Sequence, residues 1–186
     1  MSVWLCRAGK YGEHEARFVE KSKIYYTFDT VRISLSSFST KNDLQKYFLK
    51  AIPAVKENAA KVYAVQGYVF RREMAIGDWV VTPSKTTPGL LRFAEVTGEY
   101  EFDESAEEDY RHSRSVEWFA EMRREQFDAD IQAALGALMT ICKLKQEDRI
   151  KQTVHSFMNS KKCTNILPPP PRIWNFCRLI QFQNIS

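Results

Sequence analysis

The stretch GDWVVTPSKTTPGLLRFAEVTGEY, residues 77–100, gives the clearest indication of fold in this chain. Two runs rich in β-branched, aromatic and aliphatic residues, 79–82 and 90–98, flank a short polar loop that has a proline at each side. Apolar runs separated by such a loop are typical of consecutive β-strands. The loop itself carries hydroxyl groups and one lysine. Loops between strands often hold a binding site on a rigid frame. We therefore expect a functional role here, with a plain connecting loop as the alternative.

The rest of the chain predicts further strands near both ends, with helices between them. The expected elements are a strand at 3–7, a hairpin of 23–28 and 31–35, a helix over 44–52 with a cap in 39–43, a helix over 55–74, a strand at 115–119, helical segments at 125–135 and 147–158, and an apolar closing element at 136–144. Strands on both sides of two helices indicate an α+β fold built on a small, curved or closed β-barrel flanked by helices. A parallel β-α-β stack fits less well, because the later strands follow one another without helices.

Composition and charge are those of a soluble globular domain. The 186 residues are 44% hydrophobic and 27% charged, with a net charge of +4. The charge is uneven, because residues 101–130 hold eleven acidic against four basic side chains, whereas the segments on either side are basic. A basic surface attracts polyanions, but a solvated surface explains so mild an excess equally well.

The sequence predicts no cofactor or metal and a cytoplasmic location. The four cysteines form no C-x-x-C pair, and none of the three histidines lies at ligand spacing from another ligand. We therefore expect packed, reduced thiols. The first residues lack a basic segment followed by an apolar core, and no apolar run approaches the roughly 20 residues that span a bilayer. No motif of nucleophilic, phosphate-binding or dinucleotide chemistry is present.

Four blocks of sequence, taken together and in order, carry a resemblance to a known family. They are VWLCRAG (3–9), GDWVV (77–81), FAEVTGEYEFD (93–103) and HSRSVEW (112–118). Residues 1–145 resemble the EVE-type branch of the PUA-like superfamily, and are similar to the N-terminal module of Mrr-like, modification-dependent restriction proteins. The remaining residues, 146–186, are expected to form a helical and proline-containing C-terminal extension.

The resemblance implies a module that binds modified DNA and holds a flipped base, a methylated or hydroxymethylated cytosine, as the reader part of a restriction or anti-phage system. Rings of Trp4, Tyr68, Trp79 and Tyr100 are candidate pocket walls, or else core residues. Ser84 and Thr86 are candidate donors at a base edge, and Gln66 either reads such an edge or satisfies a buried backbone group. The other expected contacts with nucleic acid are Arg7, Gly9, Lys10, Lys85, His112 and Arg114, of which the last two fit a solvated surface equally well.

The chain departs from the resembling restriction proteins in one respect. Those proteins carry a nuclease domain after the reader, and the segment 146–186 is too short for one. We therefore expect a binding module and no enzyme, with a separate nuclease as a possible partner. Two alternatives remain: a non-catalytic interaction or regulatory protein that docks a partner through 160–186, and an RNA-binding PUA-like module, since related barrels serve both nucleic acids.

Overall fold

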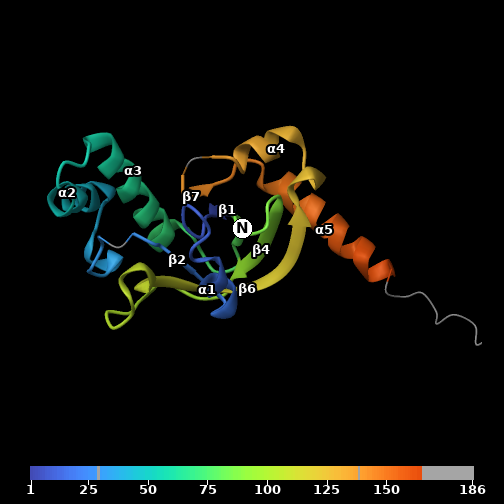
Figure 1. Cartoon of the computed structure of the whole chain (residues 1–186), viewed down its shortest axis with the longest axis horizontal. Helices are drawn as coiled ribbons and strands as arrows, with labels where there is room; N and C mark the ends of the chain where they lie inside the picture. The colour runs from blue at the N-terminus through green and yellow to red at the C-terminus, as the bar shows by residue number, and fades with distance from the viewer. Residues whose placement is uncertain (29, 138, 165–186) are drawn as a thin grey trace, which may run out of the picture.

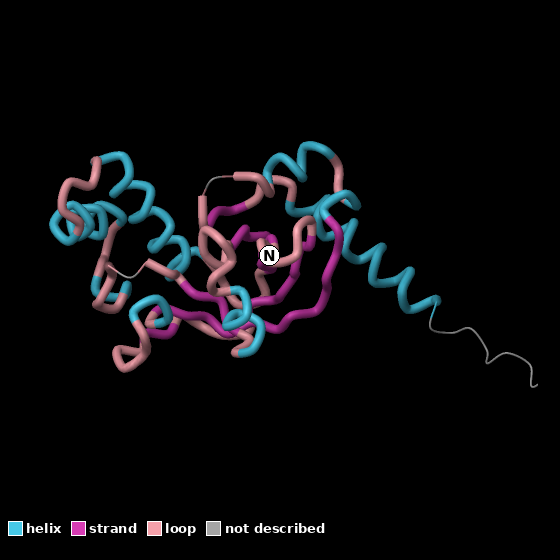
Figure 2. The backbone as a smooth tube through the Cα atoms, in the orientation of Figure 1, coloured by secondary structure: helices cyan, strands magenta, loops and turns pink. Residues whose placement is uncertain are grey.

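A computed structural model describes residues 1–28, 30–137 and 139–164, and its strands form one mixed, strongly curled sheet (Figures 1 and 2). The strands are β1 (Val3–Cys6), β2 (Lys23–Tyr25), β3 (Trp79–Pro83), β4 (Leu90–Val96), β5 (Glu101–Phe102), β6 (His112–Arg123) and β7 (Ile141–Lys143). Their order is β2-β6-β4-β3-β1-β7, and β5 pairs with β6 beside this path. Only β1 and β3 pair in parallel among the described strands. The predicted α+β class and curved sheet are confirmed at this level.

The quoted stretch forms the expected pair of strands, β3 and β4. They run antiparallel, with Trp79 opposite Glu95 and Pro83 opposite Leu91. Strand β6 lies on the other side of β4, and the register between them shifts at Phe93 and Ala94. A bulge of this kind bends a strand and increases its twist. It therefore contributes to the curl that turns the sheet into a half-barrel.

Hydrophobic side chains fill a core on each face of the sheet. In β1, Trp4 and Cys6 point into one core while Val3 and Leu5 point into the other, as the two-residue period of a strand requires. Helices α2 (Lys41–Ala51) and α3 (Glu57–Tyr68) contribute to the first core, and α4 (Ala129–Ala134) and α5 (Glu147–Thr164) to the second (Figure 1). Because β1 is buried on both faces, its sequence is an uninterrupted apolar run.

The two helices inserted after β2 form close to where their sequence patterns predict. The side chain of Thr40 accepts a hydrogen bond from the backbone N–H of Asp43, and Asp43 returns one, which makes a capping box at the start of α2. Helix α3 continues into a π-helical turn, Val69–Glu73. A Cβ atom at Gly67 would lie 3.0 Å from Leu44 Cδ2, so glycine allows α3 to pack closely against α2.

The structure corrects three expectations about the strands. Residues 31–35 form no strand, and β2 pairs instead with β6, where the backbone N–H of Tyr26 extends the ladder to His112 O at 3.1 Å. The predicted strand at 115–119 is twelve residues long, since β6 pairs with β2 and β5 near its start and with β4 along the rest of its length. The acidic segment 101–110, to which the sequence patterns assigned no strand or helix, contains β5 and a 3₁₀ turn, Glu108–Tyr110.

The last described helix packs on the second core. Ile150 and Val154 of α5 are buried there. Before it, a 3₁₀ turn (Arg124–Gln126), α4 and β7 occupy the segment expected to hold a helix and an apolar closing element. The proline run 168–171 and the segment 173–185, assigned to a docking tail, lie outside the described residues. No helix in the described part of the chain is long and apolar enough to cross a membrane.

Candidate functional site

The polar loop between β3 and β4 closes around one buried carboxylate, that of Glu15. The hydroxyl groups of Ser84 and Thr86 each donate to Glu15 Oε2 at 2.7 Å. The backbone N–H groups of Lys85 and Thr86 donate to Oε1, and Arg92 Nη1 lies 3.0 Å from Oε2. The Ser84 hydroxyl also accepts from Thr87 N at 2.8 Å. The hydroxyl groups of Ser84 and Thr86 therefore hold the loop itself, in place of the predicted contact with a base edge.

Glu15 is kept charged by this arrangement. Its burial alone would raise the pKa, but the hydrogen bonds from Lys85 N–H and from the Ser84 and Thr86 groups outweigh it and leave the pKa below its ordinary value. Arg92 supplies the balancing positive charge and also pairs with Glu121. A buried carboxylate with this many donors stabilises one loop conformation.

Two glycines allow the segment before α1 (Glu15–Glu20) to lie against this loop. Gly9 and Gly12 have φ values of +91° and +85°, which residues other than glycine rarely adopt. A Cβ atom at Gly12 would lie 2.6 Å from Glu15 Oε1 and 2.8 Å from the Cβ of Lys85. The backbone at Gly12 thus lies so close to Lys85 that there is no room for a side chain between them.

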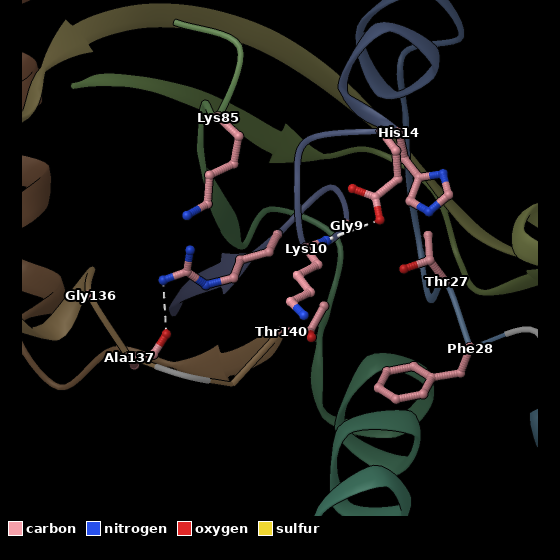
Figure 3. A pocket seen from close by; sticks show the side chains of 11 residues that line it. Gly9, Lys10, His14, Thr27, Phe28, Lys85, Gly136, Ala137 and Thr140 are labelled. Carbon is pink, nitrogen blue, oxygen red and sulfur yellow. Dashed lines mark hydrogen bonds between the residues drawn. The ribbon is translucent and has the colours of Figure 1, made fainter. Parts of the chain in front are cut away.

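An open pocket of about 550 Å³ lies beside this contact (Figure 3). Its lining residues are Arg7, Gly9, Lys10, Glu13, His14, Thr27, Phe28, Lys85, Gly136, Ala137 and Thr140. Lys10 and Lys85 extend into it from different loops, one after β1 and the other after β3 (Figure 3). Four of the residues predicted as nucleic-acid contacts, Arg7, Gly9, Lys10 and Lys85, are brought together here, although Lys10 and Lys85 are far apart in the sequence.

The acidic member of the lining stabilises the loop that carries Lys10. Glu13 accepts hydrogen bonds from the backbone N–H groups of Lys10 and Tyr11, at 3.2 and 2.7 Å. These hydrogen bonds keep the loop after β1 in one conformation, in which Tyr11 is 74% exposed. The Lys10 ammonium lies 5.0 Å from the centroid of that ring. The loop therefore presents a cation to the pocket and an exposed aromatic ring beside it.

Trp79 and Gln66, two predicted contacts, lie in the interior instead. Trp79 is 5% exposed and packs against Phe119 and His155 in the second core. Gln66 is buried on α3, and its Oε1 accepts from the backbone N–H of Ile141 at 2.8 Å. Gln66 thus satisfies a buried backbone amide and fixes α3 to β7. The expectation that these two residues contact nucleic acid is corrected by their burial.

His112 and Arg114, expected as phosphate contacts, are also buried. Arg114 donates to the carbonyl oxygens of Phe70, Arg71 and Gly98 at 2.7, 2.8 and 3.1 Å. It therefore satisfies carbonyls of the π-helical turn that lack helical partners. Phosphate contact by Arg114 is excluded, because its side chain is only 1% exposed.

A second set of interior hydrogen bonds joins His112 to Tyr100, which was also predicted to contact nucleic acid. His112 Nε2 lies 2.8 Å from Val31 O, and its Nδ1 lies 2.8 Å from the Tyr100 hydroxyl. Burial lowers the pKa of His112, so the neutral ring donates from Nε2 and accepts from Tyr100. Both predicted roles in binding are thereby replaced by structural ones. Tyr68 on α3 is half-buried, with the Lys41 ammonium 4.9 Å from its ring centroid, and Trp4 is a core residue.

Several residues of the site were not predicted from the sequence. Glu15, Arg92 and Glu13 hold the loops, while Phe28 and His14 line the pocket. The one local signal for this arrangement is the pair Gly9 and Gly12, which marks a loop with unusual backbone geometry. The described residues contain no group of three or more His, Cys, Asp or Glu side chains that could hold a metal ion. Cys6 is free and buried, and its burial raises its pKa to about 12.

A curled, mixed sheet with helices at both sides defines an α+β half-barrel that is compatible with a PUA-like fold. The chain belongs to the family described as Domain of unknown function (DUF8426), whose model matches residues 8–145. The match includes Gly9, Lys10, Glu15 and Lys85, and it ends before α5. No curated protein matches the chain.

Proposed function

We propose that the protein is a nucleic-acid-binding module that holds one modified base of DNA, a methylated or hydroxymethylated cytosine, in the pocket beside Lys10 and Lys85. The observation that carries the proposal is the convergence of Arg7, Lys10 and Lys85 on one open pocket from separate parts of the chain. Phosphate contacts by Arg and Lys supply much of the affinity of such proteins and set their register.

The dimensions and lining of the pocket suit a nucleotide. A volume of about 550 Å³ lies within the range typical of small-molecule sites, about 300–1,000 Å³. Phe28 supplies a ring on which a base can stack, a contact worth about 1–3 kcal/mol. Thr27, His14 and Thr140 supply polar groups for a base edge. Phe28 thus takes the role that sequence reasoning gave to Trp79 and Tyr100.

The exposed ring of Tyr11 supports a flipped-base mode of binding. Enzymes and readers that act on one base take it out of the duplex, which costs a few kcal/mol of stacking and pairing. An apolar or aromatic side chain inserted at the vacated step offsets that cost. Tyr11 is next to Lys10 in the chain and is held outward by the hydrogen bonds of Glu13. Such a reader would serve a restriction or anti-phage system in which a nuclease cleaves the recognised DNA.

A binding panel at fixed ionic strength tests this proposal. Fluorescence anisotropy is measured with labelled duplexes that differ only at one cytosine, which is unmodified, 5-methylated or 5-hydroxymethylated, and with RNA of the same sequence. We expect the tightest binding to one modified duplex. Equal affinity for the three duplexes would overturn base reading, and a preference for RNA would move the site to the RNA-binding alternative.

A further inference from the structure

A second hollow, of about 390 Å³, lies next to the pocket and shares Arg7, Lys85 and Gly136 with it. Its remaining lining residues are Pro83, Ser84, Pro88, Gly89, Leu90, Leu91, Arg124 and Leu135. Three cationic side chains, Arg7, Lys85 and Arg124, therefore line one cavity. Neither the sequence patterns nor the proposed base pocket assigns a role to Arg124.

Helix α4 explains why two arginines gather here. Arg7 Nη2 donates to Leu135 O at 3.0 Å and to Ala137 O at 2.8 Å. Arg124 Nη2 donates to Gln132 O. These carbonyls belong to the C-terminal turn of α4 and the residues after it, where unpaired carbonyls carry a partial negative charge that favours cations. Among the described residues, both guanidinium groups donate to backbone carbonyls alone.

Each of the two arginines has an N–H group without a hydrogen-bond acceptor among the described residues. The Nε atoms of Arg7 and Arg124 are buried and have no hydrogen-bond partner within the described part of the chain. None of the ion pairs among the described residues involves Arg7, Arg124 or Lys85. Burial lowers the pKa of Arg7, and the positive charge of Arg124 lowers it further, so the two charges repel each other.

An oxyanion in the hollow would lower the cost of holding these positive charges close together. It would accept hydrogen bonds from the guanidinium groups that line the hollow and place a negative charge between them. Planar guanidinium groups bind phosphate oxygens through two parallel hydrogen bonds, which a lysine cannot reproduce.

Two acids lie close to residues that line the hollow. Glu15 accepts from Ser84 and from the backbone N–H of Lys85, and its charge is paired with Arg92. Glu125 is exposed, and its Oε1 would be 3.2 Å from a Cβ at Gly89. Neither acid forms an ion pair with Arg7 or Arg124.

We propose that Arg7, Arg124 and Lys85 form a phosphate-binding site in the second hollow. The assignment of this phosphate to a nucleic-acid backbone rests on the proposed function, whereas the site itself requires only a phosphate group. Because Arg7 and Lys85 line both cavities, a nucleotide in the pocket and the phosphate beside it would be held on either side of the same two cations.

The test replaces Arg124 and uses Arg32 as a matched control. Arg32 is an exposed arginine that pairs with Glu108 and lines neither cavity. Binding of inorganic phosphate and of pyrophosphate is measured by calorimetry for the wild type, Arg124→Gln, Arg124→Lys and Arg32→Gln, with chloride at matched ionic strength as the reference. Duplex DNA is titrated at several salt concentrations with the same proteins. Circular dichroism and thermal unfolding report whether each variant is folded.

We expect Arg124→Gln to bind phosphate about tenfold more weakly, or not at all, while Arg32→Gln matches the wild type. For DNA, Arg124→Gln should lower the salt slope by about one and leave the preference for a modified base unchanged. Arg124→Lys keeps the charge but loses the planar fork, so it should fold and bind phosphate several-fold more weakly. If Arg124→Gln is unfolded, Arg124→Lys decides the question.

The failures of the two proposals are distinguishable. Loss of phosphate binding in the Arg124 variants without any binding of DNA by the wild type would keep the phosphate site, identify its ligand as a free phosphate compound and overturn the nucleic-acid function. A modified-base preference that is accompanied by equal phosphate binding and equal salt slopes in Arg124→Gln, Arg124→Lys and the control would keep the function and overturn the site.

Discussion

The carboxylate of Glu15 and the hydroxyl of Ser84 lie 2.7 Å apart in a buried contact that joins residues 69 positions apart in the chain. This contact fixes the loop after β3 against the segment after β1, and both segments carry a lysine that lines the pocket. The geometry of the candidate site therefore depends on an acidic residue that lines neither cavity. Three of the predictions below separate that structural role from binding.

Replacing Glu15 with Gln should destabilise the fold by about 2–3 kcal/mol. The amide would place an N–H₂ group among the hydroxyl, backbone and Arg92 donors that now converge on a carboxylate. Glu20→Gln, at an exposed position of the same helix, is the control. Urea unfolding of both variants measures the difference. Equal midpoints would mean that the carboxylate contributes nothing that an amide cannot.

Stability should fall as the pH is lowered through the range in which free carboxylates protonate. The pKa of Glu15 is below its ordinary value, so the unfolded chain takes up a proton first, near pH 4.3. The stabilisation is thus complete above that pH and is lost as the pH falls toward the lower pKa of the folded state. Asp78, which accepts from Trp4 Nε1 at 2.8 Å, should contribute in the same direction. Urea unfolding of Glu15→Gln at pH 3–7 should give a shallower pH dependence than wild type; an identical dependence would contradict the assignment.

Gly12→Ala should cost more stability than Gly77→Ala. Both glycines have nearly the same positive φ, +85° and +87°, so the backbone cost of about 1 kcal/mol or more is matched. A methyl group at Gly12 also meets Glu15 and Lys85, whereas nothing lies within 4 Å of one at Gly77. We expect an additional 1–3 kcal/mol, on the order of a forced local strain, in thermal or urea unfolding. An equal loss of stability in the two variants would show that Lys85 and Glu15 move aside for the methyl group without strain.

Lys85→Ala should weaken binding to every duplex alike and lower the salt slope by about one. The side chain is exposed and forms no ion pair among the described residues, so the fold should be unaffected. Lys61→Ala, at an exposed position of α3, is the charge-matched control. Anisotropy titrations at several salt concentrations measure both effects. A loss confined to the modified duplex would place Lys85 on the base instead of a phosphate.

Tyr11→Ala should weaken binding to duplex DNA more than to a single strand of the same sequence. An inserted ring compensates for an extruded base only where stacking has been broken. Since Tyr11 is 74% exposed, its removal should leave unfolding unchanged. A 2-aminopurine probe beside the target cytosine reports the disturbance of stacking by its fluorescence. The same loss on both substrates would make Tyr11 an ordinary surface contact.

The sequence predicted best those features that depend on neighbouring residues. Strands β3 and β4 follow from their apolar runs, and α2 follows from the cap at Thr40. Arg7, Gly9, Lys10 and Lys85 line one pocket, and their contact with nucleic acid stays a prediction of the family resemblance.

The incorrect assignments concern contacts between distant residues. Nothing near Arg114 in the chain indicates that it completes a π-helical turn 43 positions away, and charged residues are rarely buried without such a partner. Likewise, β2 has an adjacent apolar run as its nearest candidate partner, but pairs with β6. The hydrogen bond between Ser84 and Glu15 depends on how two distant loops lie in space, which no local sequence pattern indicates.

Strand β1 lies between β3 and β7, and both of its neighbours come much later in the chain. Its first paired residue, Val3, pairs with Trp79, and Cys6 pairs with Ile141. Contacts of such sequence separation require closing long loops before they stabilise anything, which slows folding. We therefore expect β3, β4 and β6 to assemble first and β1 to enter the sheet last. Arg7 and Lys10 come shortly after β1 in the chain. A folding intermediate in which β1 has not joined the sheet would therefore be compact but would lack the proposed nucleotide pocket.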